Sequence, residues 1–392
     1  MASDLRYQFL QTLSDESDDD KHVIIRLYIA LDKANIIRDR FVIKKVTTDD
    51  RAIFNERQAV CRIIDTLPNS GAILKHRFWS CHDHGEHLGP DSKPRYEVKR
   101  YMDFCSAGTL SNIIEEYSAG KWQQDTDDQI PEPMFWITLI TISEAIYNLT
   151  TGLMYTPGMD DAAEAFGWIP KVHRDIKPSN IFLMEPQDPF TSFPRPVLAD
   201  LDDMLELFGY EEYTKKYHLF TRGYAAPENN IELHTLDPDA RGFGYFQRQP
   251  LSCKTDIWSL GTVLWEMMHS FLGPHKAQGL WHGGVTNTLH PDPAQSRFLK
   301  HTIPVLAPTI DEPNYTRDLI RIFELCNQSI PARRPTAVGL RRLVERKMRR
   351  AQKCLGSFEG DVEERMRVRY RKEEFGMRPN TGLTKRRRGH WV

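Results

Sequence analysis

The first hundred residues alternate apolar and polar side chains with the two-residue period of β-strands. This alternation predicts strands over residues 22–31, 40–46 and 95–104, which are rich in Val, Ile, Tyr and Phe. One helix-like segment, residues 48–64, lies between the second and third of these strands. The pattern therefore predicts a small sheet accompanied by one helix.

Beyond Pro133 the period changes to that of an α-helix. Apolar residues recur at alternating steps of three and four, which predicts an amphipathic helix; they are Leu139, Ile142, Ile146, Leu149 and Leu153. Residues 255–271 are apolar around most of the helical circumference, as in a helix buried within a domain. A last amphipathic helix begins near Thr336. The order of these strands and helices along the chain predicts an α+β fold, with a β-rich part followed by a larger, mainly helical part.

The composition is that of a soluble globular protein. Of the 392 residues, 40% are hydrophobic and 27% are charged, which excludes disordered and fibrous classes. The chain starts without the basic and then apolar order of a secretory signal, and no apolar run reaches the 18 residues of a membrane span, so we expect no membrane association. Six cysteines without metal-binding spacing favour reduced thiols and a cytoplasmic or nuclear location.

The net charge of −2 hides a difference between the body and the C-terminal tail. From Arg341 onward the sequence has 17 Lys and Arg against 7 Asp and Glu, so this part carries +10 and the rest carries −12. Two interpretations of the tail stay open: a solvated surface, or a segment that binds an acidic partner or an import receptor. A nucleic-acid partner is not favoured.

The segment KVHRDIKPSNIFL, residues 171–183, concentrates polar side chains directly before an apolar strand. Asp175 and Asn180 lie five residues apart across a Lys-Pro turn. Such a loop can present a carboxylate to a hydroxyl group and an amide oxygen to a metal ion. Lys177 adds a positive charge in the same loop.

This segment resembles the catalytic loop of the eukaryotic protein kinase family. Further motifs match the same family: VLADLDD at the place of Asp-Phe-Gly, TRGYAAPE with its Ala-Pro-Glu, DIWSLG from Asp256, and ARRPTA. The resemblance implies that Glu228 pairs with Arg334 and that Asp256 clamps the backbone of the catalytic loop. It also implies a bilobal protein-kinase-like fold, with a small β-rich N-lobe and a larger, mainly helical C-lobe.

The resemblance assigns a role to each residue of the phosphate-transfer site. Asp175 would orient the acceptor hydroxyl and take its proton, Lys177 would offset phosphate charge, and Thr221 would steady Asp175, as in serine/threonine kinases. Asn180 and Asp200 would hold Mg²⁺. The expected substrates are ATP and a serine or threonine of a protein.

By the same resemblance, the N-lobe supplies most of the ATP site. Lys44 aligns better than Lys45 with the strand lysine of the family, and Glu56 would hold it against the α and β phosphates. A solvated surface pair is the alternative for these two residues. The adenine slot would be lined by Val42, Met102, Asp103, Cys105 and Phe182.

Two departures from the family pattern leave the activity open. Asp202 stands where the family has the glycine of Asp-Phe-Gly, and no glycine precedes Gly71, although a glycine-rich turn normally covers the ATP phosphates. The acidic run SDESDDDK occupies that turn. An active serine/threonine kinase is the first interpretation, and a pseudokinase that serves as a binding or scaffold module is the second. A small-molecule kinase is disfavoured by the AAPE segment and Arg334.

The motifs divide the chain into a kinase domain and a tail. We expect the domain over residues 1–350, with the N-lobe over about 1–102, the hinge over about 103–108 and the C-lobe over about 109–350. Residues 351–392 would form the basic C-terminal tail.

Overall fold

The computed structural model describes residues 5–18, 20–85, 94–118, 129–158, 164–208, 221, 223–229, 250–270, 315–328 and 330–370. These residues divide into two compact units. The first contains the described residues up to Thr66 together with Leu74–Ser106, and the second contains Leu67–Ile73 and the described residues from Ala107 onward.

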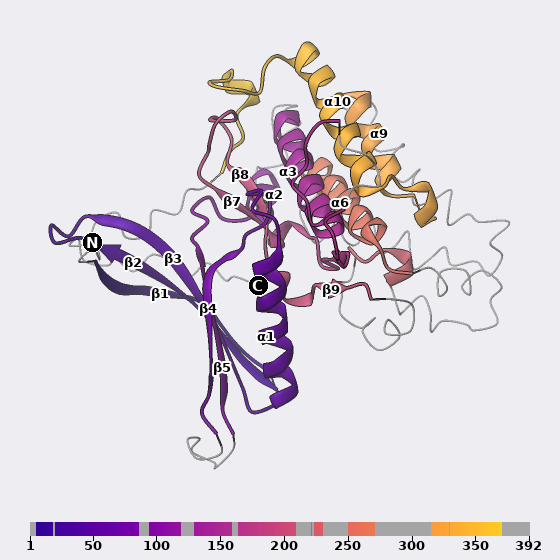
Figure 1. Ribbon diagram of the computed structural model, residues 1–392. Coiled ribbons are helices and arrows are strands. Elements are labelled where there is room, and N and C mark those ends of the chain that lie inside the picture. The colour runs from indigo at the N-terminus through magenta and orange to yellow at the C-terminus, as the bar shows by residue number, and fades with distance from the viewer. Residues whose placement is uncertain are drawn as a thin grey trace. The chain divides into compact units, whose positions relative to one another are not determined.

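The first unit is a five-stranded antiparallel sheet with one helix (Figure 1). The strand order is β1-β2-β3-β5-β4. The strands are β1 (Arg6–Ser17), β2 (Lys21–Leu31), β3 (Ile37–Thr48), β4 (His76–Asp83) and β5 (Tyr96–Asp103), and the helix is α1 (Arg51–Thr66). All three strands predicted from the sequence are present, and β3 is longer than predicted at both ends.

One face of the sheet packs against α1. Phe54 of α1 stacks on Tyr96 of β5 with ring centroids 4.9 Å apart, and Cys61 and Val98 complete a buried cluster. These apolar residues recur on one side of the helix and at alternate positions of the strand, so burial of that face fixes both elements.

The second unit is mainly helical. Its longer helices are α2 (Leu110–Ser118), α3 (Glu132–Thr151), α6 (Cys253–Met268), α9 (Arg317–Cys326) and α10 (Ala337–Leu355). Two short antiparallel pairs accompany them: β6 (Lys171–Val172) with β9 (Leu205–Glu206), and β7 (Ile181–Met184) with β8 (Arg195–Leu198). The helix predicted after Pro133 is confirmed as α3.

The predicted helix over residues 255–271 begins earlier, at Cys253, and α6 ends at Met268. Ser252 caps its first turn by accepting a hydrogen bond from the Lys254 N–H, and Thr255 completes a capping box. Every residue of α6 from Thr255 to Met268 is buried, as its apolar circumference predicts. Among the helices in the described ranges, none is long and apolar enough to cross a membrane.

Candidate active site

The loop between β6 and β7 is held by a buried carboxylate of α6. Asp256 accepts hydrogen bonds from the backbone N–H groups of His173, at 2.8 Å, and Arg174, at 2.9 Å. Arg174 has a φ of 69°, a backbone conformation that a residue with a side chain adopts at a cost in energy. The two hydrogen bonds hold the loop in that conformation, which confirms the clamp predicted for Asp256.

Asp175, Lys177 and Thr221 are joined to one another by three close polar contacts. Its Oδ1 accepts a hydrogen bond from the Thr221 hydroxyl at 2.5 Å, and its Oδ2 lies 2.8 Å from Lys177 Nζ. Lys177 also donates to Thr221 Oγ1 at 2.7 Å. The Asp175 side chain is 10% exposed, so both carboxylate oxygens are fixed in direction within a partly desolvated site.

Asn180 and Asp200 are brought close together by the β7–β8 pair. Ile181 pairs with Leu198, so the residue before β7 adjoins the residues after β8, and the Ala199 N–H donates to the Asn180 carbonyl oxygen at 2.9 Å. Asn180 Nδ2 donates to Asp175 Oδ2 at 2.9 Å. Because the amide nitrogen of Asn180 is engaged in this way, its Oδ1 is the atom left to serve as a ligand. An amide oxygen beside a carboxylate is a donor set that suits Mg²⁺.

Asp203 is a further carboxylate of this site that sequence reasoning missed. Burial, followed by the charges of Asp175, Asp202 and Asp200, raises its pKa above the usual range of a carboxyl group, and the charge of Arg174 opposes the shift. Arg174 Nε donates to the Asp203 backbone carbonyl at 2.7 Å. The run of three aspartates in DLDD was the available signal, and its last member lies next to the catalytic loop.

Register in the sheet decides which of the two adjacent lysines of β3 faces α1. Lys44 lies directly across from Arg100 of β5, in the row of alternate residues that includes Val98 of the α1-facing cluster. Lys45 points to the opposite face, where it pairs with Glu97 at 3.5 Å. The preference for Lys44 is supported by this alternation.

Glu56 is exposed on α1, whereas Phe54 and Cys61 of the same helix face the sheet. The pairing of Glu56 with Lys44 stays a prediction.

The predicted adenine-lining residues come from both units. In the first unit Val42 lies directly opposite Met102, on the same face as Lys44, and Cys105 is buried. The Asp103 carboxylate accepts a hydrogen bond from Arg77 at 2.7 Å. In the second unit Phe182 of β7 is half-buried, whereas its neighbours Ile181 and Leu183 are fully buried. The adenine contacts themselves remain predictions.

The turn between β1 and β2 is shorter than predicted. Asp15 and Glu16 belong to β1, where they lie opposite Ile24 and Val23, so the acidic turn proper spans residues 18–20. The Asp18 side chain accepts a hydrogen bond from the Lys21 N–H at 3.0 Å.

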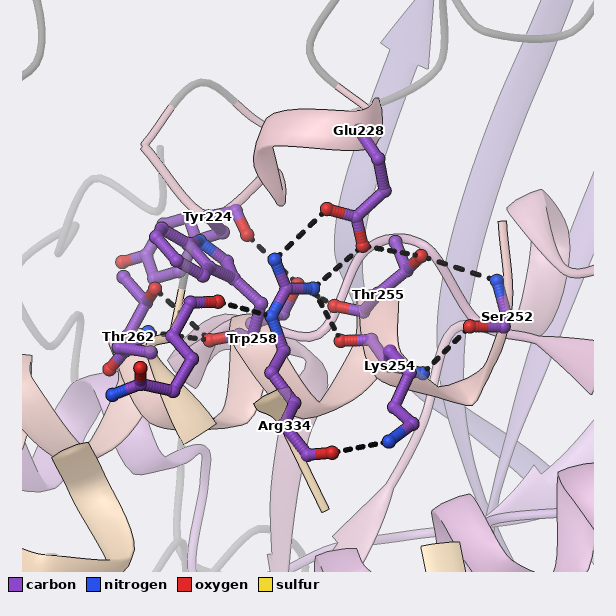
Figure 2. A network of polar contacts seen from close by, with 11 residues as sticks. Tyr224, Glu228, Ser252, Lys254, Thr255, Trp258, Thr262 and Arg334 are labelled. Carbon is purple, nitrogen blue, oxygen red and sulfur yellow. Dashed lines mark hydrogen bonds and ion pairs between the residues drawn. The ribbon is translucent and has the colours of Figure 1, made fainter. Parts of the chain in front are cut away.

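A buried ion pair joins two distant segments of the second unit (Figure 2). Arg334 Nη1 lies 2.6 Å from Glu228 Oε1, and Nη2 lies 3.0 Å from Oε2. Arg334 also donates to the Lys254 carbonyl, and Thr255 Oγ1 donates to Glu228. The pairing predicted for Glu228 is confirmed.

The loop around Asp175, the clamp by Asp256 and this ion pair fit what the sequence motifs predicted, and comparison with known proteins bears on the same question. No protein-family model matches the chain. It is similar to the G2-specific protein kinase fin1 of Schizosaccharomyces pombe, 28% identical over 182 residues, which cover 45% of this chain and 21% of the relative. Serine/threonine-protein kinase 16 of Homo sapiens is 29% identical over 174 residues, covering 44% of this chain and 46% of the relative. Over these parts the chain is similar to protein kinases.

A third protein to which the chain is similar is the serine/threonine-protein kinase US3 homolog of Gallid herpesvirus 2, 34% identical over 96 residues, which cover 24% of this chain and 18% of the relative. The matched parts span less than half of each of the three relatives. The small sheet unit and the larger helical unit are the two lobes of the kinase fold, so the predicted α+β bilobal fold is confirmed.

Proposed function

We propose that this chain is an active serine/threonine protein kinase, which transfers the γ-phosphate of Mg-ATP to a hydroxyl group of a protein. The observation that carries the proposal is the fixed geometry of Asp175. Its two carboxylate oxygens are oriented by Thr221 and Lys177, and Asp256 clamps the backbone of the same loop. A scaffold module has no need of a carboxylate held in this way.

In this proposal Asp175 accepts a hydrogen bond from the substrate hydroxyl, aligns its oxygen with the γ-phosphorus, and takes the proton as the bond forms. Lys177, 2.8 Å from Asp175, and Lys44 offset the negative charge of the phosphates. Mg²⁺, when held by Asn180 and Asp200, neutralises charge on the β and γ phosphates.

The choice of serine or threonine follows from Lys177 and Thr221, which match the serine/threonine branch. Their side chains are hydrogen-bonded to each other at 2.7 Å. Two of the three named relatives are serine/threonine-protein kinases by name. We expect phosphate on serine or threonine of the protein substrate, and chiefly phosphotyrosine in a phosphoamino-acid analysis would overturn this assignment.

A pseudokinase is the second candidate, and one observation favours it. The sequence between β1 and β2 is acidic where the family has glycine. In that case the chain would act as a binding or scaffold module in the cytoplasm or nucleus. The basic tail expected over residues 351–392 would then bind an acidic partner or an import receptor, and its part from residue 371 onward lies outside the described residues.

Incubation of the purified chain with Mg²⁺, ATP labelled at the γ-phosphate, and casein or a basic protein distinguishes the two candidates. Label should enter the acceptor with the wild-type chain and not with Asp175→Asn, which keeps the size of the side chain and loses the base. Equal labelling by both proteins would show that Asp175 is not the catalytic base. No labelling by either, with Mg-ATP bound in calorimetry, would favour the pseudokinase.

A further inference from the structure

The chain does not leave the second unit where its last long helix ends. After α10 stops at Leu355, residues 356–370 lie against the same unit (Figure 1, yellow). We call these residues the C-terminal strap. Phe358 is fully buried, and Val362 and Val368 are each 6% exposed. A solvated tail would leave such side chains in water, and burying each one stabilises the folded state by about 1.5–3 kcal/mol.

The first attachment of the strap is the loop that joins β7 to β8. The Gly360 N–H donates to the Pro189 carbonyl at 2.8 Å. Ser192 bridges two strap positions, because its hydroxyl donates to the Gly360 carbonyl at 2.8 Å and accepts from the Val362 N–H at 3.3 Å. One small side chain therefore fixes the strap at two successive points.

The second attachment is α2. The Arg369 N–H donates to the Tyr117 hydroxyl at 3.0 Å, and the Arg369 guanidinium carbon lies 4.5 Å from the centre of the Tyr117 ring. Tyr117 is 3% exposed. The combination of a hydrogen bond and a cation–π contact on one buried ring ties the end of the strap to the last turn of this helix.

Helix α2 is connected in turn to the strand that carries Phe182. The segment just before α2 is bound to β7 on both sides, since the Ala107 N–H donates to the Leu183 carbonyl at 3.1 Å and the Leu183 N–H donates to the Gly108 carbonyl at 2.9 Å. Thr109 also forms a β-bridge with Phe182. The strap, α2 and β7 thus form a continuous set of contacts within the second unit.

We propose that the C-terminal strap is an integral part of the kinase domain and a positioning element for α2 and the adjoining end of the hinge. The kinase domain then extends at least to Tyr370, beyond the boundary at residue 350 expected from the sequence. The consequence for nucleotide binding rests on the proposed function, whereas the attachment to α2 does not.

Two truncated chains test whether the strap, and not the residues after it, contributes to the stability of the domain. A chain that ends at Leu355 should unfold at a temperature lower by roughly 5 °C or more, while a chain that ends at Tyr370 should unfold within about 1 °C of the full chain. Equal unfolding temperatures for all three would overturn the proposal.

Point variants keep the test decisive even if the shorter truncation fails to fold. Tyr117→Phe removes the hydroxyl and keeps the ring, and Ser192→Ala removes both hydrogen bonds to the strap. In hydrogen exchange by mass spectrometry, each should raise the exchange rate of the strap amides several-fold, and Tyr117→Phe should do so for α2 as well. Thr191→Ala, which alters the exposed neighbouring residue, is the control and should change neither. Unchanged exchange in both variants would contradict the proposal.

Calorimetry with Mg-ATP then distinguishes a failure of the strap proposal from a failure of the proposed kinase function. Tyr117→Phe should weaken nucleotide binding several-fold, with a smaller effect on the rate of phosphate transfer at saturating ATP. A wild-type chain that binds no nucleotide would count against the proposed function. The hydrogen-exchange data would still test whether the strap is attached to α2. Faster exchange at α2 with unchanged nucleotide affinity would refute its role in positioning the hinge.

Discussion

Arg334 and Glu228 form a two-point ion pair in which neither side chain is exposed to solvent. The two residues are 106 positions apart in the chain. Their pairing ties the end of the Ala-Pro-Glu segment to the residues just before α10, and Thr255 of α6 joins the same network. The contact therefore connects three separate parts of the helical lobe.

Removal of one partner should strongly destabilise this lobe. Arg334→Ala leaves the Glu228 carboxylate buried without a counter-charge, so we expect a loss of roughly 3–5 kcal/mol in the free energy of unfolding. Arg333→Ala, at the exposed neighbouring position, should change it by less than about 0.5 kcal/mol. Denaturant unfolding measures both variants, and equal losses would show that the ion pair is not the cause.

The buried Glu266 should make stability depend on pH near neutrality. Burial raises the pKa of its carboxyl from 4.5 to about 7, while the hydrogen bond from the Tyr224 hydroxyl acts in the opposite direction. Because the folded pKa is the higher one, this group's contribution to stability is complete below about pH 4.5 and is lost as the pH rises through about 7.

The neutral variant Glu266→Gln serves as the reference for this effect. Between about pH 5 and pH 8, the wild-type chain should lose up to roughly 3 kcal/mol of stability relative to the variant. Thermal unfolding in a series of buffers measures the difference. A difference that stays constant with pH would show that the carboxyl does not titrate in this range.

The acidic turn between β1 and β2 should weaken ATP binding. At about 8 Å and an effective dielectric constant near 20, each carboxylate repels one phosphate charge by about 2 kcal/mol before screening. Replacement of Asp18, Asp19 and Asp20 by Ser should therefore lower the Michaelis constant for ATP, and higher Mg²⁺ should lower that of the wild-type chain. Asp49→Ser, at another exposed carboxylate of the same lobe, is the control.

A wild-type chain that already binds Mg-ATP tightly would refute the repulsion. An unchanged Michaelis constant in the triple variant would show that the turn lies away from the phosphates. Binding rescued only by the triple variant would support an enzyme whose own turn limits its affinity for ATP.

The parts of the site that sequence could predict are those that short motifs encode. Asp256, Glu228 and Arg334 each belong to a short motif with a fixed structural role, so the resemblance placed their contacts correctly. The catalytic role of Asp175 stays a prediction. The choice of Lys44 was also possible, because strand alternation separates it from Lys45.

Other features depend on contacts between distant segments that no local pattern reveals. Phe358, Val362 and Val368 lie among charged residues without helical or strand periodicity, so the strap was assigned to the tail. The start of α6 was missed by two residues because the cap is Ser252. The exposure of Glu56 depends on how α1 rotates on its sheet, which its sequence pattern alone does not fix.

The central claim is that Asp175 is the base of an active kinase, and the rate of phosphate transfer at saturating Mg-ATP tests it most directly. Asp175→Ala should lower turnover by about 100-fold or more, with a much smaller change in nucleotide affinity by calorimetry. Transfer by the variant at the wild-type rate would contradict the account.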